Sequence, residues 1–198
     1  MATRYFEDFP EGLTVELGSV EFTADSIVEF ARAWDPQTMH TDPESARNSI
    51  YGGLIASGWH TVAAYMRMLV DQVIGDSDSV GSPGIDNLRW VKPVRPGDTL
   101  RGRFVVLESR ESRSRPDWGI VRSRGEMLNQ NDELVMQVEA VNFFGRRPYR
   151  WRAAARRLAI KAAVAPAPTP LSMLTTTRPG AQVWSMDSRA ATPPPPSP

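Results

Sequence analysis

The spacing of hydrophobic and polar residues changes several times along the chain, and each change predicts an element. Residues 13–22 have the pattern of a β-strand, with Gly18 as a predicted bulge. The apolar residues that follow recur at helical spacing, which predicts a short amphipathic helix with Thr23 as its N-cap. This helix should end at Asp35, because Pro36 disfavours helical geometry in the residue before it.

Two further helices follow, and each begins at a residue that can cap it. Asp42, with Pro43 at the first helical position, predicts a short helix that ends near residue 48. After a glycine pair that breaks the chain, Ser57 precedes a longer apolar segment at residues 58–74. Apolar residues occupy most of the surface of this longer helix, so we expect it to be largely buried.

Beyond Gly84 the pattern returns to strands separated by turns. A polar loop or hairpin tip is expected at residues 109–117. An early helical layer followed by an antiparallel meander indicates an α+β fold, with a single sheet packed on one long helix. The predicted strands lie near residues 88–90, 100–108, 120–128 and 133–144.

Composition divides the 198 residues into a domain and a tail. Residues 1–147 have the composition of one globular domain, whereas residues 148–198 hold ten of the 17 prolines and are rich in alanine and arginine. We predict that this tail is disordered. A basic helix at residues 149–164, contacting acidic partners or anionic lipid, is the alternative interpretation.

Charge and residue types narrow the possible partners and locations. The net charge is zero, but 16 basic and 22 acidic residues precede residue 148, and such an acidic body does not suggest a nucleic-acid-binding protein. No apolar run approaches the ~18 residues of a membrane helix. Cysteine is absent, which excludes disulfides and thiolate catalysis. With an N-terminus unlike a signal peptide, these features predict a cytoplasmic protein without membrane contact.

Candidate chemistry is concentrated in residues 30–65, which contain both histidines. Asp35 and His40 are five residues apart and could reach one water molecule if the intervening chain folds back. A carboxylate and an imidazole, whose pKa is ordinarily about 6.5, are suited to general acid–base catalysis. In the alternative interpretation, Asp35 ends a turn and His40 is an ordinary polar residue.

Gly58 is a third candidate, through its backbone. In the first turn of the long helix its N–H lacks an intrahelical acceptor and could polarise a carbonyl oxygen. Gly58 could instead serve only close packing of helix and sheet. His60 points to a different helix face and is expected to be structural, and Asp42 is expected to be a helix cap.

These residues together resemble the hydratase motif of the MaoC-like family, which includes the (R)-specific enoyl-CoA hydratases. Asp35, His40 and Asp42 match that motif, and Gly58 follows His40 by eighteen residues, as in the family. The motif's usual Asn-Pro is replaced by Gln-Thr at positions 37 and 38, and Ser57 stands where a histidine often precedes the glycine. The resemblance covers about residues 5–147.

The resemblance implies a hotdog fold, in which a curved antiparallel sheet wraps around one long helix. It implies a homodimer or larger homo-oligomer acting on an acyl-CoA thioester, with no metal and no cofactor beyond the CoA of the substrate. Asp35 and His40 would activate the water that adds to C3 of an enoyl thioester. Gly58 N–H would bind the thioester oxygen, and Gly53 and Ser57 would help to bind the substrate.

Two alternative functions remain open from the sequence. A hotdog thioesterase would use the same fold, and the Gln-Thr replacement leaves room for a non-catalytic acyl-CoA-binding subunit.

The arginines of the predicted hairpin tip have two possible roles. They could bind the phosphates of CoA, or they could simply be solvated. The arginines concerned are Arg110, Arg113 and Arg115.

Overall fold

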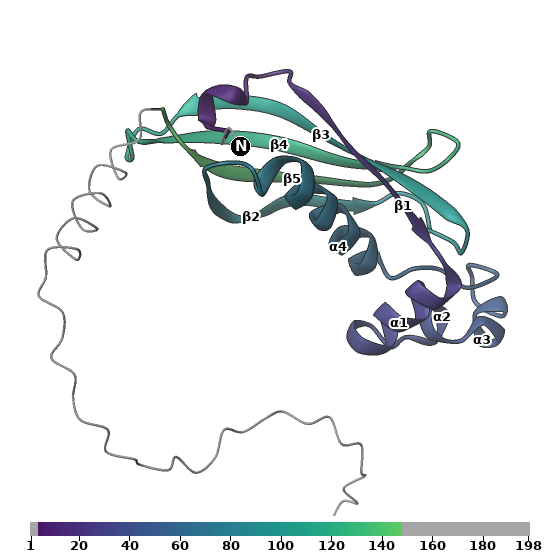
Figure 1. Cartoon of the computed structure of the whole chain (residues 1–198). Helices are drawn as coiled ribbons and strands as arrows, with labels where there is room; N and C mark the ends of the chain where they lie inside the picture. Colours follow the sequence, from purple (N-terminus) through teal and green to yellow (C-terminus); the bar gives the residue numbers. More distant parts are fainter. Residues whose placement is uncertain (1–3, 148–198) are drawn as a thin grey trace, which may run out of the picture. The chain divides into compact units, whose positions relative to one another are not determined.

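The computed structural model describes residues 4–147, which form one antiparallel sheet with a helix, α4, packed against it (Figure 1). The predicted tail at residues 148–198, with its alternative basic helix, lies outside the described residues. The sheet has the strand order β1-β3-β4-β5-β2. Its strands are β1 (Thr14–Phe22), β2 (Ser79–Trp90), β3 (Asp98–Glu111), β4 (Trp118–Leu128) and β5 (Leu134–Gly145).

The N-terminal half follows the sequence pattern closely. β1 carries its register shift between Glu16 and Gly18, and Gly18 has a φ of 90°, which glycine adopts without strain. Helix α1 (Ala24–Trp34) begins where the Thr23 hydroxyl accepts a hydrogen bond from Ser26 N–H. It ends before Pro36, as predicted.

Two short helices connect α1 to the central segment. Helix α3 (Pro43–Arg47) begins at Asp42, whose carboxylate accepts hydrogen bonds from two backbone N–H groups, so the predicted cap is confirmed. Helix α2 (Thr38–Thr41) is not predicted by the pattern, because four residues are too few to show a helical period. It carries His40 and makes the chain fold back after Asp35.

The long helix is present, but it is less buried than its composition predicts. α4 (Gly58–Leu69) continues as a π-helical turn (Val70–Ile74), so the predicted range is confirmed. The expectation that this helix is largely buried is wrong, because one of its faces is exposed. Trp59 is 55% exposed, Met66 48% and Val70 38%.

The buried face of α4 fits onto the sheet at two glycines. A Cβ added at Gly102 of β3 would lie 2.8 Å from the Met68 side chain, and one at Gly125 of β4 would lie 2.2 Å from the Tyr65 ring. Strand glycines thus make room for two large buried side chains of the helix. The predicted α+β arrangement, one sheet packed on one long helix, is confirmed.

A cluster of aromatic rings fills the space between the N-terminal turn and the sheet. The rings of Phe9 and Phe144 stack with their centroids 4.2 Å apart, and Phe104 meets Phe9 edge to face. These rings are almost fully buried, as expected for residues that contribute most to a core. This cluster and the α4 contacts fix the sheet against which the site's helix, α4, packs.

β2 is longer than the sequence pattern predicts. It begins at Ser79 rather than after Gly84 and includes Gly81 and Pro83. Glycine and proline ordinarily mark a break, but an edge strand tolerates both, because one side of its backbone needs no partner. β2 is the edge strand beside β5. Within residues 4–147, no helix has the length and apolar character that crossing a bilayer requires.

Candidate active site

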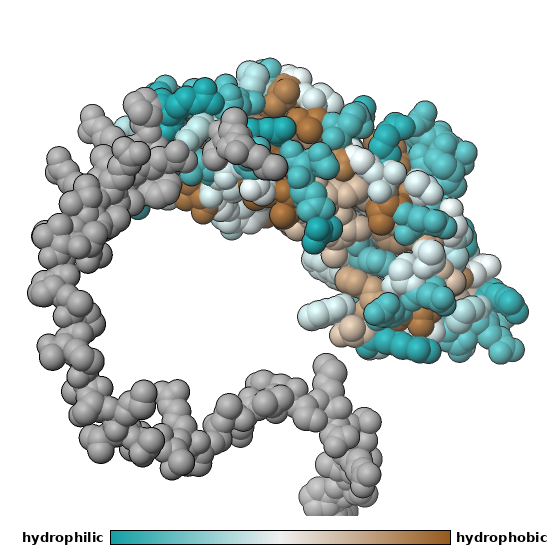
Figure 2. Space-filling view, in the orientation of Figure 1, coloured by the Kyte–Doolittle hydropathy of each residue, from teal (hydrophilic) through white to brown (hydrophobic). Residues whose placement is uncertain are grey.

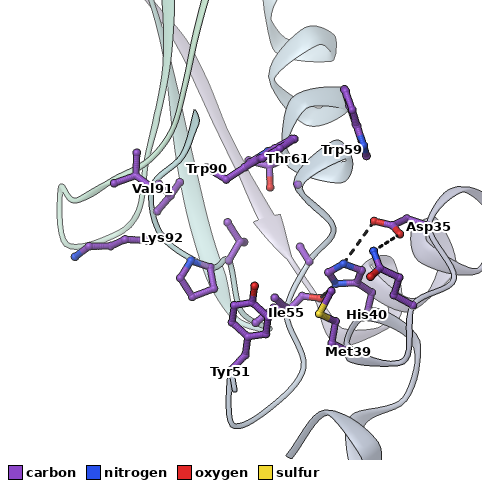
Figure 3. Close-up of a pocket in the computed structure, with 16 residues that line it drawn as sticks. Asp35, Met39, His40, Tyr51, Ile55, Trp59, Thr61, Trp90, Val91 and Lys92 are labelled. Atoms are coloured by element: carbon purple, nitrogen blue, oxygen red, sulfur yellow. Dashed lines mark hydrogen bonds and ion pairs between the residues drawn. The ribbon is translucent and has the colours of Figure 1, made fainter. Parts of the chain in front are cut away.

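The candidate residues come from three neighbouring pieces of the chain. Asp35 is at the end of α1, His40 is on α2, and Gly58 opens α4. In Figure 3 the His40 ring faces Asp35, while Tyr51 and Lys92 stand on the opposite side of the cavity. The structure therefore brings the three sequence-predicted residues to one cavity.

His40 is held by a backbone carbonyl. Its side chain is 5% exposed, and Nδ1 lies 2.9 Å from the carbonyl oxygen of Ile55. A carbonyl oxygen only accepts hydrogen bonds, so Nδ1 carries a proton and donates. In the neutral ring Nε2 is therefore unprotonated and offers a lone pair toward Asp35.

Asp35 is fixed through both of its carboxylate oxygens. The Gln37 side-chain amide donates to Oδ1 at 2.8 Å, and the Ser57 hydroxyl donates to Oδ2 at 2.6 Å. Oδ2 lies 3.5 Å from Nε2 of His40. In the neutral state of His40 these two atoms are both acceptors, and a donor that bridges them satisfies both.

The same contacts keep Asp35 ionised. Hydrogen bonds from the Ser57 hydroxyl and then the Gln37 amide lower the pKa of Asp35, burial opposes them, and His40 contributes a further lowering. A carboxylate whose charged form is stabilised in this way remains an acceptor at neutral pH. It can hold a water proton without first losing one of its own.

Gly58 lines the cavity, and an aromatic ring covers it. A Cβ added at Gly58 would lie 2.4 Å from Cε2 of Trp90, so only glycine fits beneath this indole. The Trp90 ring also meets Trp59 edge to face, with the centroids 5.6 Å apart. Gly58 N–H has no acceptor among the described residues. Gly58 therefore combines close packing against Trp90 with a backbone N–H that could bind a ligand's oxygen.

The two residues predicted to bind the substrate, Gly53 and Ser57, do not line the cavity. Ser57 is 0% exposed, and its hydroxyl has two protein partners, Asp35 and Trp59 N–H. Gly53 lies beside the Arg95 side chain, whose guanidinium donates to the Tyr51 carbonyl. This geometry gives no support to substrate binding by Ser57 or Gly53, since neither presents a surface to the cavity.

The cavity has a volume of about 450 Å³. Asp35, His40 and Gln37 give it one polar side, and Lys92, which forms an ion pair with Glu133, lies on the opposite side. The remaining walls are mainly apolar, as is usual for a small-molecule site. They are formed by Met39, Tyr51, Ile55, Ala56, Trp59, Trp90, Val91, Pro93, Val94 and Val135, with Gly58 and Thr61.

Other sequence candidates lie elsewhere. His60 stacks on Phe30 with the ring planes 6° apart, and it does not line the cavity, in keeping with its predicted structural role. Arg110 pairs with Glu108, and the Arg115 guanidinium lies over the Trp118 ring. These arginines sit at the far end of β3 and β4 from α2 (Figure 1).

Sequence reasoning missed several contacts that shape the site. The sequence marks Gln37 as a replacement but not as a partner of Asp35, although its position two residues later is the available signal. The Ile55 carbonyl and the Trp90 ring carry no local signal, because both depend on how distant segments meet. Among residues 4–147, no three histidine or carboxylate side chains gather as metal ligands would.

Fold and site together define a class of protein: a hotdog domain with a carboxylate and a histidine beside the start of its central helix. The family model described as "MaoC like domain" matches residues 10–122, more than half of the chain. The chain therefore belongs to the MaoC-like dehydratase family. The matched range contains Asp35, His40 and Gly58.

Individual relatives agree with this assignment. The crystal structure of a MaoC-like dehydratase from Rhodospirillum rubrum is 39% identical, with a TM-score of 0.67, and the match covers 73% of this chain and 98% of that one. The protein YdeM of Bacillus subtilis is 29% identical over 133 residues, which are 67% of this chain and 93% of YdeM. Mesaconyl-CoA hydratase of Cereibacter sphaeroides is 37% identical over 92 residues, 46% of this chain but 23% of that enzyme.

Proposed function

We propose that this protein is a hydratase that adds water reversibly across the C2–C3 double bond of an enoyl-CoA thioester. The proposal rests on the pair of acceptors, Asp35 Oδ2 and His40 Nε2, which lie 3.5 Å apart in a cavity with mainly apolar walls. Family membership and the likeness to a mesaconyl-CoA hydratase support the reaction class. We include the (R) configuration of the product in the proposal because the family resemblance implies it.

The chemistry follows from what each group accepts or donates. A water molecule donates one hydrogen to Asp35 and one to His40, which leaves an oxygen lone pair for C3 of the enoyl group. As the C3–O bond forms, negative charge moves through C2 to the thioester oxygen. Gly58 N–H, at the positive end of α4, stabilises that charge. The proton taken from water returns to C2, so water is added without any other reagent.

Turnover of enoyl thioesters tests the proposal. Purified protein mixed with crotonyl-CoA, and with longer and branched enoyl-CoAs, should lower the absorbance of the conjugated thioester without releasing free thiol. Release of free thiol from saturated acyl-CoA would instead identify a thioesterase. Saturable binding of CoA esters without turnover would identify a non-catalytic subunit, and either result would overturn the proposal.

We also propose that two copies of the chain associate through β2. β1 and β2 are the two edges of the sheet, and their exposed residues differ in character. The exposed positions of β1 are polar or glycine, whereas β2 exposes Val80 and Ile85, at 42% and 51%. The view in Figure 2 shows apolar residues between polar ones over the region of α4 and β2. An unpaired edge with apolar side chains is a template for strand pairing.

Light scattering measures this association directly. The wild type should have twice the chain mass of 22.0 kDa, and Ile85→Lys should shift the mass toward that of one chain, because it places a charge on the apolar edge. Glu21→Lys, on the opposite edge strand, is the matched control and should leave the mass unchanged. A wild type of single-chain mass at the concentrations used for activity would contradict the proposal.

A further inference from the structure

The Ser57 side chain joins the two halves of the site. Its hydroxyl donates to Asp35 Oδ2 at 2.6 Å, and the same oxygen accepts the Trp59 N–H at 3.2 Å. Ser57 is also the covalent neighbour of Gly58, whose N–H opens the helix. One buried hydroxyl therefore contacts both the acid–base carboxylate and the first turn of α4.

A helix cap alone does not account for this arrangement. Capping requires only an oxygen that accepts from the first turn, and Thr23 at the start of α1 shows such a cap. Its hydroxyl donates to nothing in the site. Ser57 uses its additional proton on a carboxylate 22 positions earlier in the chain, at a distance typical of a strong O–H···O⁻ hydrogen bond.

We infer that Ser57 is a positioning residue, which holds the Asp35 carboxylate at a fixed place relative to the Gly58 N–H. Attack by water at C3 and charge on the thioester oxygen occur at the same moment, so the groups that serve them must keep their separation. The Gln37 amide fixes the other oxygen, Oδ1, and completes the orientation. This role for Ser57 rests on the proposed hydratase function.

A positioning role for Ser57 affects the ionisation of Asp35, which a purely structural cap would not do. Among the titratable groups of the described residues, His40 is the one that faces Asp35; its other partners, Ser57 and Gln37, are neutral. The Ser57 hydroxyl is the largest cause of the lowered pKa of Asp35. Removing it raises that pKa, so the Asp35 carboxylate takes up its proton at a higher pH as the solution is acidified.

Ser57→Gly is the informative variant, because glycine still serves as an N-cap at little cost but has no hydroxyl. We expect kcat on an enoyl-CoA to fall about 10- to 100-fold, the usual loss for a hydrogen bond to a charged group. Thr23→Gly, the matched cap variant, should keep the wild-type kcat.

A second measurement separates this inference from the proposed reaction. With carboxyl-labelled aspartate, an NMR titration of Asp35 follows its ionisation in the wild type and in Ser57→Gly, whether or not any substrate is turned over. The midpoint should be higher in Ser57→Gly and unchanged in Thr23→Gly. An unchanged midpoint, or a wild-type kcat in Ser57→Gly, would overturn the inference. A wild type that hydrates no enoyl thioester would overturn the proposed function instead.

Discussion

His40→Asn and Asp35→Asn will each lower kcat for enoyl-CoA hydration by roughly 10²–10⁴-fold, the usual contribution of a general acid–base group. Asparagine at position 40 keeps an amide N–H near the place of Nδ1, so the bond to the Ile55 carbonyl can persist while Nε2 is lost. Asparagine at position 35 keeps the shape of the carboxylate and removes its charge. Initial-rate kinetics on the substrate that the wild type hydrates best measure both losses.

The controls come from the same stretch of chain. His60→Phe replaces the other histidine, which stacks on Phe30 outside the cavity, and Asp42→Asn keeps an N-cap at the start of α3. Both should retain wild-type kcat. Wild-type turnover in His40→Asn or Asp35→Asn, with a circular dichroism spectrum like that of the wild type, would show that the pair does not carry the chemistry.

Gly58→Ala is the second change with a large expected effect, and it acts in two ways. The new Cβ would lie 2.4 Å from the Trp90 ring, so the variant should lose about 1–3 kcal/mol of unfolding free energy through overpacking. The Cβ also tilts toward the start of the helix, where the thioester oxygen must approach the N–H. We expect kcat/KM to fall by roughly 10²–10³-fold, as when one oxyanion-binding donor is lost.

The double variant Gly58→Ala/Trp90→Ala separates the two effects, with Trp90→Ala alone as its reference. Without the indole, the stability cost of Gly58→Ala should disappear, while the loss of kcat/KM should remain. Thermal unfolding and initial-rate kinetics on the four proteins complete the cycle. If activity returned together with stability, Gly58 would serve packing alone.

The sequence predicts best those features that depend on contacts between residues close together in the chain. Thr23 and Asp42 cap helices because their side chains reach N–H groups two or three residues ahead, and such contacts follow from spacing. The placement of Asp35 before Pro36 follows from the same local rules. The family resemblance then adds His40 and Gly58, for which spacing alone leaves ordinary roles open.

The contacts that the sequence does not predict are those between distant segments. The Ser57–Asp35 hydrogen bond spans 22 positions, and the Trp90 ring reaches Gly58 from the end of β2. The open face of α4 is a further case, because composition shows how apolar a helix is but not how much of it the sheet covers. The family resemblance implies substrate binding for Ser57, whereas the positioning role that we infer depends on the long-range hydrogen bond to Asp35.

Mass spectrometry of crotonyl-CoA incubated with the wild type in isotopically labelled water distinguishes hydration from thioester cleavage. Hydration should give a CoA ester heavier by one molecule of water, with the labelled oxygen on C3 and the thioester intact. Asp35→Asn should give little of this product. Recovery of unchanged crotonyl-CoA, or of free CoA with the label in a released acid, from wild-type protein that binds the substrate would show that the protein is not a hydratase.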